Sequence, residues 1–268
     1  MRAGYDARRR NRRIGTAAHG HGADNRFVIP RPRTAGFQPT VRLGEYRVVH
    51  RQVAGRRRTF LVERTRADCW HACTIDDLCR ILSHMPAADL AGPDLLFILR
   101  QPTRKQQLLA PVWGRLCFWL NIGPYEGTAV VLDAEQTPRT LRWSRHLDPS
   151  SARERERLLD DGHEAAVDRR GTTFRVTLQS ARNTQLYRTL PHEIGHLVDF
   201  DRHSTDRYRQ RTALEREEAA HRYADSFRHR LAGAGHIPFP RIADPGSIRA
   251  DGLDPADFLA PDSADTGD

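Results

Sequence analysis

Residues 188–201 read Arg-Thr-Leu-Pro-His-Glu-Ile-Gly-His-Leu-Val-Asp-Phe-Asp and contain the pattern His-Glu-x-x-His at residues 192–196. On an α-helix, residues i and i+4 lie one turn apart on the same face, so His192 and His196 can bind one ion together. Glu193 follows the first histidine, where its carboxylate can accept a proton from a metal-bound water. Chance alone would produce this pattern roughly 0.03 times in a chain of this composition. The pattern therefore predicts a catalytic site with one Zn²⁺ per chain.

The residues around this pattern predict a helix over about 188–201 with one buried face. Pro191 is the difficult residue, because a proline inside a helix removes a hydrogen bond and clashes with the preceding turn. Either the helix begins near Thr189, which leaves the proline in its first turn, or it kinks at the proline. The apolar residues that define the buried face are Leu190, Ile194, Leu197 and Val198.

A hydrolytic zinc site usually has three protein ligands and one open position. The metzincin spacing would place a glycine and a third histidine at positions that contain Asp199 and Arg202, which argues against that arrangement. Asp199 lies on roughly the same helical face as His196, and we expect it to orient an imidazole or to face solvent. The remaining source of a ligand is the next predicted helix, over residues 212–232.

Residues 215–225 of that helix read Glu-Arg-Glu-Glu-Ala-Ala-His-Arg-Tyr-Ala-Asp. They contain Glu-x-x-Ala at 217–220, followed by Tyr-Ala at 223–224. Together with the upstream His-Glu-x-x-His, this arrangement resembles the gluzincins, in particular the minigluzincins and the lethal-factor-type zincins. The resemblance implies that Glu217 is the third metal ligand and that the small Ala220 allows the two helices to pack closely.

The resemblance covers residues 74–232 and is specific only in its two helical motifs. Glu218 is the alternative third ligand, and a nearby aspartate, a histidine or no third ligand also stay open. His221 follows Glu217 by one turn and can orient it or stabilise an oxyanion. Tyr223 can donate a hydrogen bond to an oxyanion, although a core aromatic is the simpler interpretation.

In zincins of this kind, the strand before the motif helix is a sheet edge that binds the substrate backbone in an extended form. The segment Thr172–Gln179 occupies that place and alternates polar and apolar residues as a strand does. The resemblance therefore implies a substrate-binding edge strand that includes Thr173, Arg175 and Thr177.

The order of the predicted elements indicates an α+β fold. We expect a zincin-like domain with a small mixed sheet, an active-site helix and a following helix that contains the third ligand. A capping box at Thr74 and Asp77 begins an earlier helix, and Pro86 marks its end. Strands are predicted at 45–50, 59–64, 94–100, 112–120, 128–132 and 172–179, and a further helix at 150–160.

Composition divides the chain into four expected regions. Residues 1–40 are an Arg-rich arm and residues 236–268 a tail rich in Pro and Asp, and we expect both to be disordered. Between them lie a β-hairpin-like segment at 41–73, around a basic turn at 54–58, and a catalytic domain at 74–235. Four cysteines do not suggest a disulfide scaffold, so we expect a cytoplasmic protein. No apolar stretch is long enough to span a membrane.

The basic charge is concentrated at the N-terminus. Residues 1–58 contain 15 Arg against three acidic residues, a net of +12, so the total of +9 leaves −3 for the rest. Clustered arginine attracts phosphate, which would allow nucleic-acid binding, but a solvated extension has the same composition and is the interpretation we prefer.

Zinc-dependent hydrolysis of a peptide bond, with a protein or peptide as substrate, is the leading hypothesis from the sequence. The alternatives are a toxin-like zincin effector, a DNA-associated regulator with a zincin domain, and a non-catalytic metal-binding scaffold. The sequence does not indicate an oligomeric state.

Overall fold

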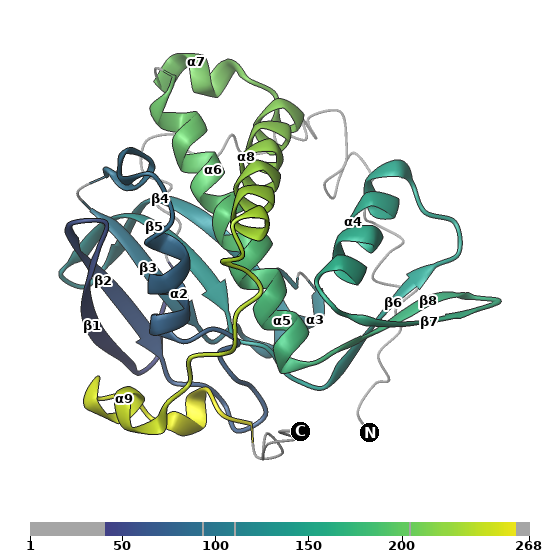
Figure 1. Cartoon of the computed structure of the whole chain (residues 1–268), viewed down its shortest axis with the longest axis horizontal. Helices are drawn as coiled ribbons and strands as arrows, with labels where there is room; N and C mark the ends of the chain where they lie inside the picture. The colour runs from purple at the N-terminus through teal and green to yellow at the C-terminus, as the bar shows by residue number, and fades with distance from the viewer. Residues whose placement is uncertain (1–40, 93, 110, 204, 261–268) are drawn as a thin grey trace, which may run out of the picture. The chain divides into compact units, whose positions relative to one another are not determined.

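The core of the fold is a five-stranded mixed sheet with the order β1-β2-β3-β5-β4 (Figure 1). This computed structural model describes residues 41–260 except 93, 110 and 204, so the predicted disorder of 1–40 and 261–268 lies outside the described residues. β2, β3 and β5 are mutually parallel, whereas β1 and β4 pair antiparallel at the two edges. The strands are β1 (Tyr46–Val53), β2 (Arg56–Glu63), β3 (Leu95–Arg100), β4 (Gly114–Ile122) and β5 (Tyr125–Asp133).

The middle strands are apolar because both faces of the sheet are covered. All six residues of β3 are buried. One face packs against helices, and Phe60, Phe97 and Val130 contribute to that core. The side chains of Leu61, Ile98 and Val131 alternate with them and form a smaller core on the other face. The mixed α+β fold predicted from the element order is therefore confirmed.

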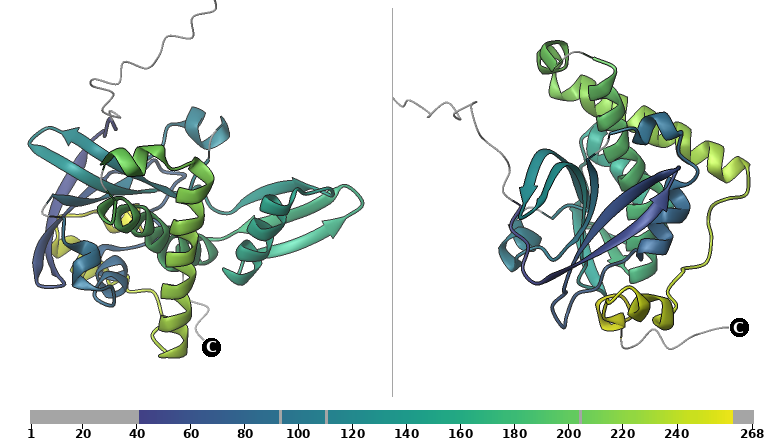
Figure 2. Two further views of the ribbon diagram at one scale, coloured as in Figure 1. Left: turned by 90° about the horizontal axis from the view of Figure 1, so that it is seen from above. Right: turned by 90° about the vertical axis from the view of Figure 1, so that its left-hand side faces the viewer.

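Helices cover one face of this sheet, as the right-hand view of Figure 2 shows. The capping box predicted at Thr74 is present, since its hydroxyl accepts from the Asp77 amide and the Asp77 carboxylate accepts from the Thr74 amide. The capped helix is α2 (Ile75–Leu82). The other helices of the main body are η1 (Ala87–Leu90), α3 (Arg104–Leu109), α5 (Leu178–Thr184), η2 (Gln185–Thr189), α6 (Leu190–Asp201), α7 (Thr205–Gln210) and α8 (Ala213–Gly233). No helix within the described ranges is long and apolar enough to cross a membrane.

The predicted hairpin at 41–73 is not a separate segment, because β1 and β2 are two of the five strands of this sheet. Its turn is also shorter than expected. Ala54 and Gly55 both have positive φ, at 50° and 75°, which suits a two-residue turn whose twist matches the strands. Arg56 and the two arginines after it therefore belong to β2 and not to the turn.

A second sheet, with the order β6-β8-β7, extends away from the first beside α4 (Pro149–Asp160) (Figures 1 and 2). Its strands are β6 (Arg139–Ser144), β7 (Glu164–Asp168) and β8 (Gly171–Val176). We call residues 139–176 the β6–β8 lobe. Its central strand is β8, which begins one residue before the predicted strand 172–179 and ends three residues early. Thr177 ends the strand because its side chain caps α5 instead.

The expected disorder at 236–268 is wrong for residues 236–260. These residues contain α9 (Pro245–Ala250) and η3 (Pro255–Asp257), whose first turns are capped by Asp244 and Asp254. Scattered apolar residues anchor the segment in the main core, and they are Ile237, Phe239, Ile248, Leu253 and Phe258. The composition is polar enough to suggest disorder, but single well-spaced apolar side chains suffice because the helices and sheet supply the rest of the core.

A buried ion pair fastens this C-terminal segment to the helices. Arg182 in α5 and Asp77 in α2 are fully buried and form two hydrogen bonds of 2.7 and 3.0 Å. The same guanidinium donates to the carbonyl of Phe239 at 3.2 Å, and Asp77 accepts from the amide of Ile242 at 3.1 Å. Three segments of the chain, α2, α5 and the C-terminal segment, therefore meet at one pair of charges.

Replacing Arg182 by methionine should lower the free energy of unfolding by about 3–5 kcal/mol, because it leaves the Asp77 carboxylate buried without its partner. Urea denaturation of Arg182→Met measures this loss. The matched control is Arg142→Met, which removes an exposed pair with Asp168 and should cost about 1 kcal/mol or less. Equal losses in the two variants would show that the buried pair does not anchor the segment.

Candidate metal centre

The His-Glu-x-x-His residues lie on α6, which continues from α5 through the π-helical turn η2. The amide of Leu190 donates to the carbonyl of Gln185, five residues back, so the backbone is wider directly before Pro191. This π-turn accommodates the proline, which has no N–H to donate and whose ring would clash in a regular turn. The first sequence expectation is confirmed, because α6 begins directly after Thr189 and leaves Pro191 in its first turn. The sequence did not predict that α5 and η2 precede α6 as one continuous helical segment from Leu178.

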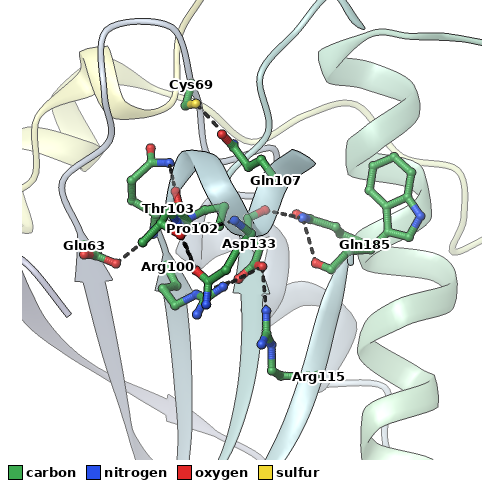
Figure 3. A network of polar contacts seen from close by, with 12 residues as sticks. Glu63, Cys69, Arg100, Pro102, Thr103, Gln107, Arg115, Asp133 and Gln185 are labelled. Carbon is green, nitrogen blue, oxygen red and sulfur yellow. Dashed lines mark hydrogen bonds and ion pairs between the residues drawn. The ribbon is translucent and has the colours of Figure 1, made fainter. Parts of the chain in front are cut away.

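Polar contacts hold the π-turn against the sheet (Figure 3). The Gln185 side-chain amide donates to the carbonyls of Asp133 at 2.7 Å and Trp113 at 3.1 Å. The carboxylate of Asp133 in turn accepts from Arg100 and Arg115, at 2.8–2.9 Å. Because this network joins β3, β4 and β5 to η2, it fixes where α6 begins relative to the sheet.

Two small residues let α6 and α8 touch through their backbones. A Cβ atom added to Gly195 would lie 2.9 Å from Cα and 3.0 Å from the carbonyl oxygen of Ala220. Any side chain at Gly195 would therefore push the helices apart. Ala220, which is fully buried, has the close-packing environment that the gluzincin resemblance implies for it.

This close approach brings three possible ligands together. Nε2 of His192 lies 3.3 Å from Oε2 of Glu217, and Nε2 of His196 lies 3.5 Å from Oε1. One ligand atom from each of the three residues lies within 4.8 Å of the others. Tetrahedral zinc with bonds of about 2.0–2.2 Å places neighbouring ligand atoms about 3.3–3.5 Å apart. The donor types and separations fit such an ion.

The charges around the cluster favour ligand forms at neutral pH. Burial, with the neighbouring His192, lowers the pKa of His196, so its imidazole is neutral and has a free lone pair. The hydrogen bond from His192 lowers the pKa of Glu217, which keeps its carboxylate ionised. Nδ1 of His192 is buried without a hydrogen-bond partner among the described atoms.

Glu193 is the acid–base candidate, and it is only 8% exposed. Burial raises the pKa of its carboxyl group, while the neighbouring His192 and the backbone amide of Leu116 lower it. A carboxylate whose pKa is raised by burial is a stronger proton acceptor than a solvated one. The hydrogen bond from Leu116 also shows that β4 runs directly beside the His-Glu-x-x-His pattern.

The edge strand beside α6 is β4, not β8 as the resemblance implied. β8 is paired on both sides, so Thr173 and Arg175 have no free backbone edge to offer a peptide. β4 is the last strand in the order of the five-stranded sheet. Gly114 lets this strand pass close to η2, since a Cβ there would lie 2.8 Å from the Thr189 side chain. The sequence contained the strand but no signal of its place in the sheet.

Two of the predicted supporting residues face other partners. The hydroxyl of Tyr223 donates to the carboxylate of Asp89 at 2.7 Å, and its ring packs against the main core. This geometry favours the interpretation of Tyr223 as a core aromatic, because its hydroxyl is bonded to Asp89. The carboxylate of Asp199 contacts Arg211 and lies 3.6 Å from His203. Among the described residues, no hydrogen bond joins it to the imidazole of His192 or His196.

His221 lies beside the cluster, with its ring centroid 4.4 Å from that of His192. Its Nε2 lies 3.3 Å from Nη1 of Arg157 in α4. Burial, followed by the charges of His192 and Arg157, lowers the pKa of His221 to about 4, so this ring is neutral at pH 7. Arg157 was not among the predicted site residues, because an arginine in a charged surface helix gives no signal of a distant contact.

A pocket of about 390 Å³ opens beside the cluster. Its lining includes His192, Glu193 and His221, together with Leu141 and Trp143 of the β6–β8 lobe. The lobe is therefore a wall of the pocket, a role that its charged and unremarkable sequence did not predict.

The fold and the site together define an α+β protein with two histidines and a glutamate that can hold a metal, next to a buried carboxylate. Comparison of the chain with family models, with curated proteins and with solved structures finds no match.

Purified wild-type protein should contain about one zinc per chain, and His192→Ala and Glu217→Ala should lose it, because two remaining ligands hold zinc much more weakly. Metal analysis after dialysis measures the content. Glu218→Ala is the matched control and should keep its zinc, since this neighbouring glutamate pairs with Arg222. If Glu217→Ala keeps its zinc and Glu218→Ala loses it, the third ligand is Glu218 and not Glu217.

Proposed function

We propose that this chain is a gluzincin-like zinc metallopeptidase that hydrolyses peptide bonds in protein substrates. The observation that carries the proposal is the convergence of His192, His196 and Glu217 within 4.8 Å, with Glu193 adjacent on the same helix. The donor set is the one found in catalytic zinc sites that keep an open position. Zinc bound there would act as a Lewis acid and lower the pKa of a bound water to about 7.

The residues of the chain have separate tasks in this proposal. His192 and His196 would hold the ion from one helix face, and the Glu217 carboxylate would hold it from α8. The carboxylate of Glu193 would accept a proton from the attacking water and later donate it to the nitrogen of the leaving amine. The Leu116 amide fixes the orientation of that carboxylate, which keeps it ready for both transfers.

The free edge of β4 supports a peptide as the substrate. β4 is the terminal strand and its Leu116 amide donates to Glu193, so an extended chain paired with the rest of this edge would pass the catalytic carboxylate. Backbone pairing of this kind requires an unfolded segment but no particular sequence. That favours flexible segments of proteins as substrates.

The variant Glu193→Gln should keep one zinc per chain but lose peptide hydrolysis by about 10²–10⁴-fold, because the amide cannot accept the proton of the attacking water. The assay incubates zinc-loaded protein with a denatured protein mixture and counts new N-termini by mass spectrometry. Glu218→Gln is the control and should cleave as the wild type does. If the wild type with full zinc creates no new N-termini, the site is a non-catalytic scaffold.

A further inference from the structure

Four aromatic side chains form a cluster where β4, α6 and α7 meet. Phe200 is central, with its ring centroid 4.7 Å from Phe118, 5.9 Å from Trp119 and 5.1 Å from Tyr208. Tyr208 is 8% exposed and closes the inner side of the cluster. Trp119 covers the outer side and is 55% exposed. The cluster therefore presents one large indole surface to solvent.

The backbone at Trp119 is strained. Its φ is 53°, in the left-handed region that bulky L-residues rarely adopt. The register between β4 and β5 shifts between Cys117 and Leu120, so the tryptophan lies in a β-bulge. Bulges of this kind redirect a side chain, often next to a functional site. The positive φ and the exposed indole each cost stability. A role in binding therefore explains this residue better than a role in folding.

The cluster lies in line with the candidate metal centre. Phe200 follows His196 by four residues on α6, which places it one turn further along, about 6 Å. On β4, Leu116 contacts Glu193, and Trp119 is three residues further on, at most about 10 Å because the bulge shortens the strand. Both β4 and α6 therefore extend from the candidate metal ligands toward the indole of Trp119.

We infer that Trp119, supported by Phe200, forms a subsite for one large apolar or aromatic side chain of an extended peptide. This inference rests on the proposed function, because the peptide is its substrate. At about 3.3 Å per residue, the recognised side chain is two or three residues from the peptide bond that is cleaved. Trp119 is therefore a specificity-determining residue and not a catalytic one.

A second copy of the chain is the competing occupant of an exposed indole. The continuity of the cluster with the free edge of β4 and with the metal ligands favours the peptide. An aromatic platform at the end of an open strand edge supplies what backbone pairing lacks, namely a pocket for one side chain. Stacking on an indole selects aromatic and large aliphatic groups over polar ones.

The test uses Trp119→Gly, because glycine adopts a positive φ without strain and removes the indole. If Trp119 serves the fold, this variant lowers the melting temperature. If Trp119 serves the substrate, the melting temperature stays unchanged or rises. Val167→Ala shortens another exposed apolar side chain, on β7 and outside the cluster, and is the control.

Both variants are made in full-length, zinc-loaded Glu193→Gln protein, which is used to select binders from a random peptide display library. We expect peptides with Trp, Phe, Tyr, Leu or Met at one fixed position, and at least about tenfold weaker binding of these peptides by Trp119→Gly alone. Selection that is unchanged by Trp119→Gly, or no selected peptide at all, overturns the inference. A change from dimer to monomer in Trp119→Gly with unchanged peptide selection assigns the surface to self-association instead.

The selected peptides are then offered to the wild-type enzyme, which separates this inference from the proposed function. Peptides that bind through Trp119 and are cleaved support both. Peptides that bind through Trp119 but remain intact retain the subsite and contradict the peptidase.

Discussion

The close contact between α6 and α8 at Gly195 and Ala220 is the constraint on which the site depends. The two histidines come from one helix, and their spacing alone would present them to solvent or to any neighbour. Only a partner helix whose backbone lies against Gly195 brings the Glu217 carboxylate within 3.5 Å of both imidazoles. A methyl group at Gly195 would separate the helices, and the donor atoms would separate with them.

The position of α6 is determined from its N-terminal side. Gln185 binds two carbonyls of the sheet, and the π-turn that follows lets the helix pass Pro191 without a break. A π-turn beside a functional motif is a common exception to regular helix geometry. Here the π-turn also explains how Pro191 is accommodated, because the interior of a regular helix would not accept a proline.

The pocket beside the candidate metal cluster has two walls, which come from different parts of the chain. One wall comes from the start of β4 and from α6, with Gly114, His192 and Glu193. The other is the β6–β8 lobe, which contributes Leu141 and Trp143. The lobe also holds Arg157 against His221, so this part of the chain affects the charge near the candidate metal ligands. The edge strand and the lobe are adjacent to the site although neither belongs to the two helical motifs.

Local spacing was sufficient to predict the α+β class, the capping box at Thr74, and the helix that contains His192, Glu193 and His196, because each depends on residues within one or two turns. Glu217 was reached only through a resemblance, and its distance to the histidines came from helix packing. No local pattern encodes strand order, which is why the resemblance implies β8 as the edge strand whereas the edge beside α6 is β4. Burial of residues 236–260 and the exposure of Trp119 likewise depend on what distant segments cover, and no local pattern contains that information.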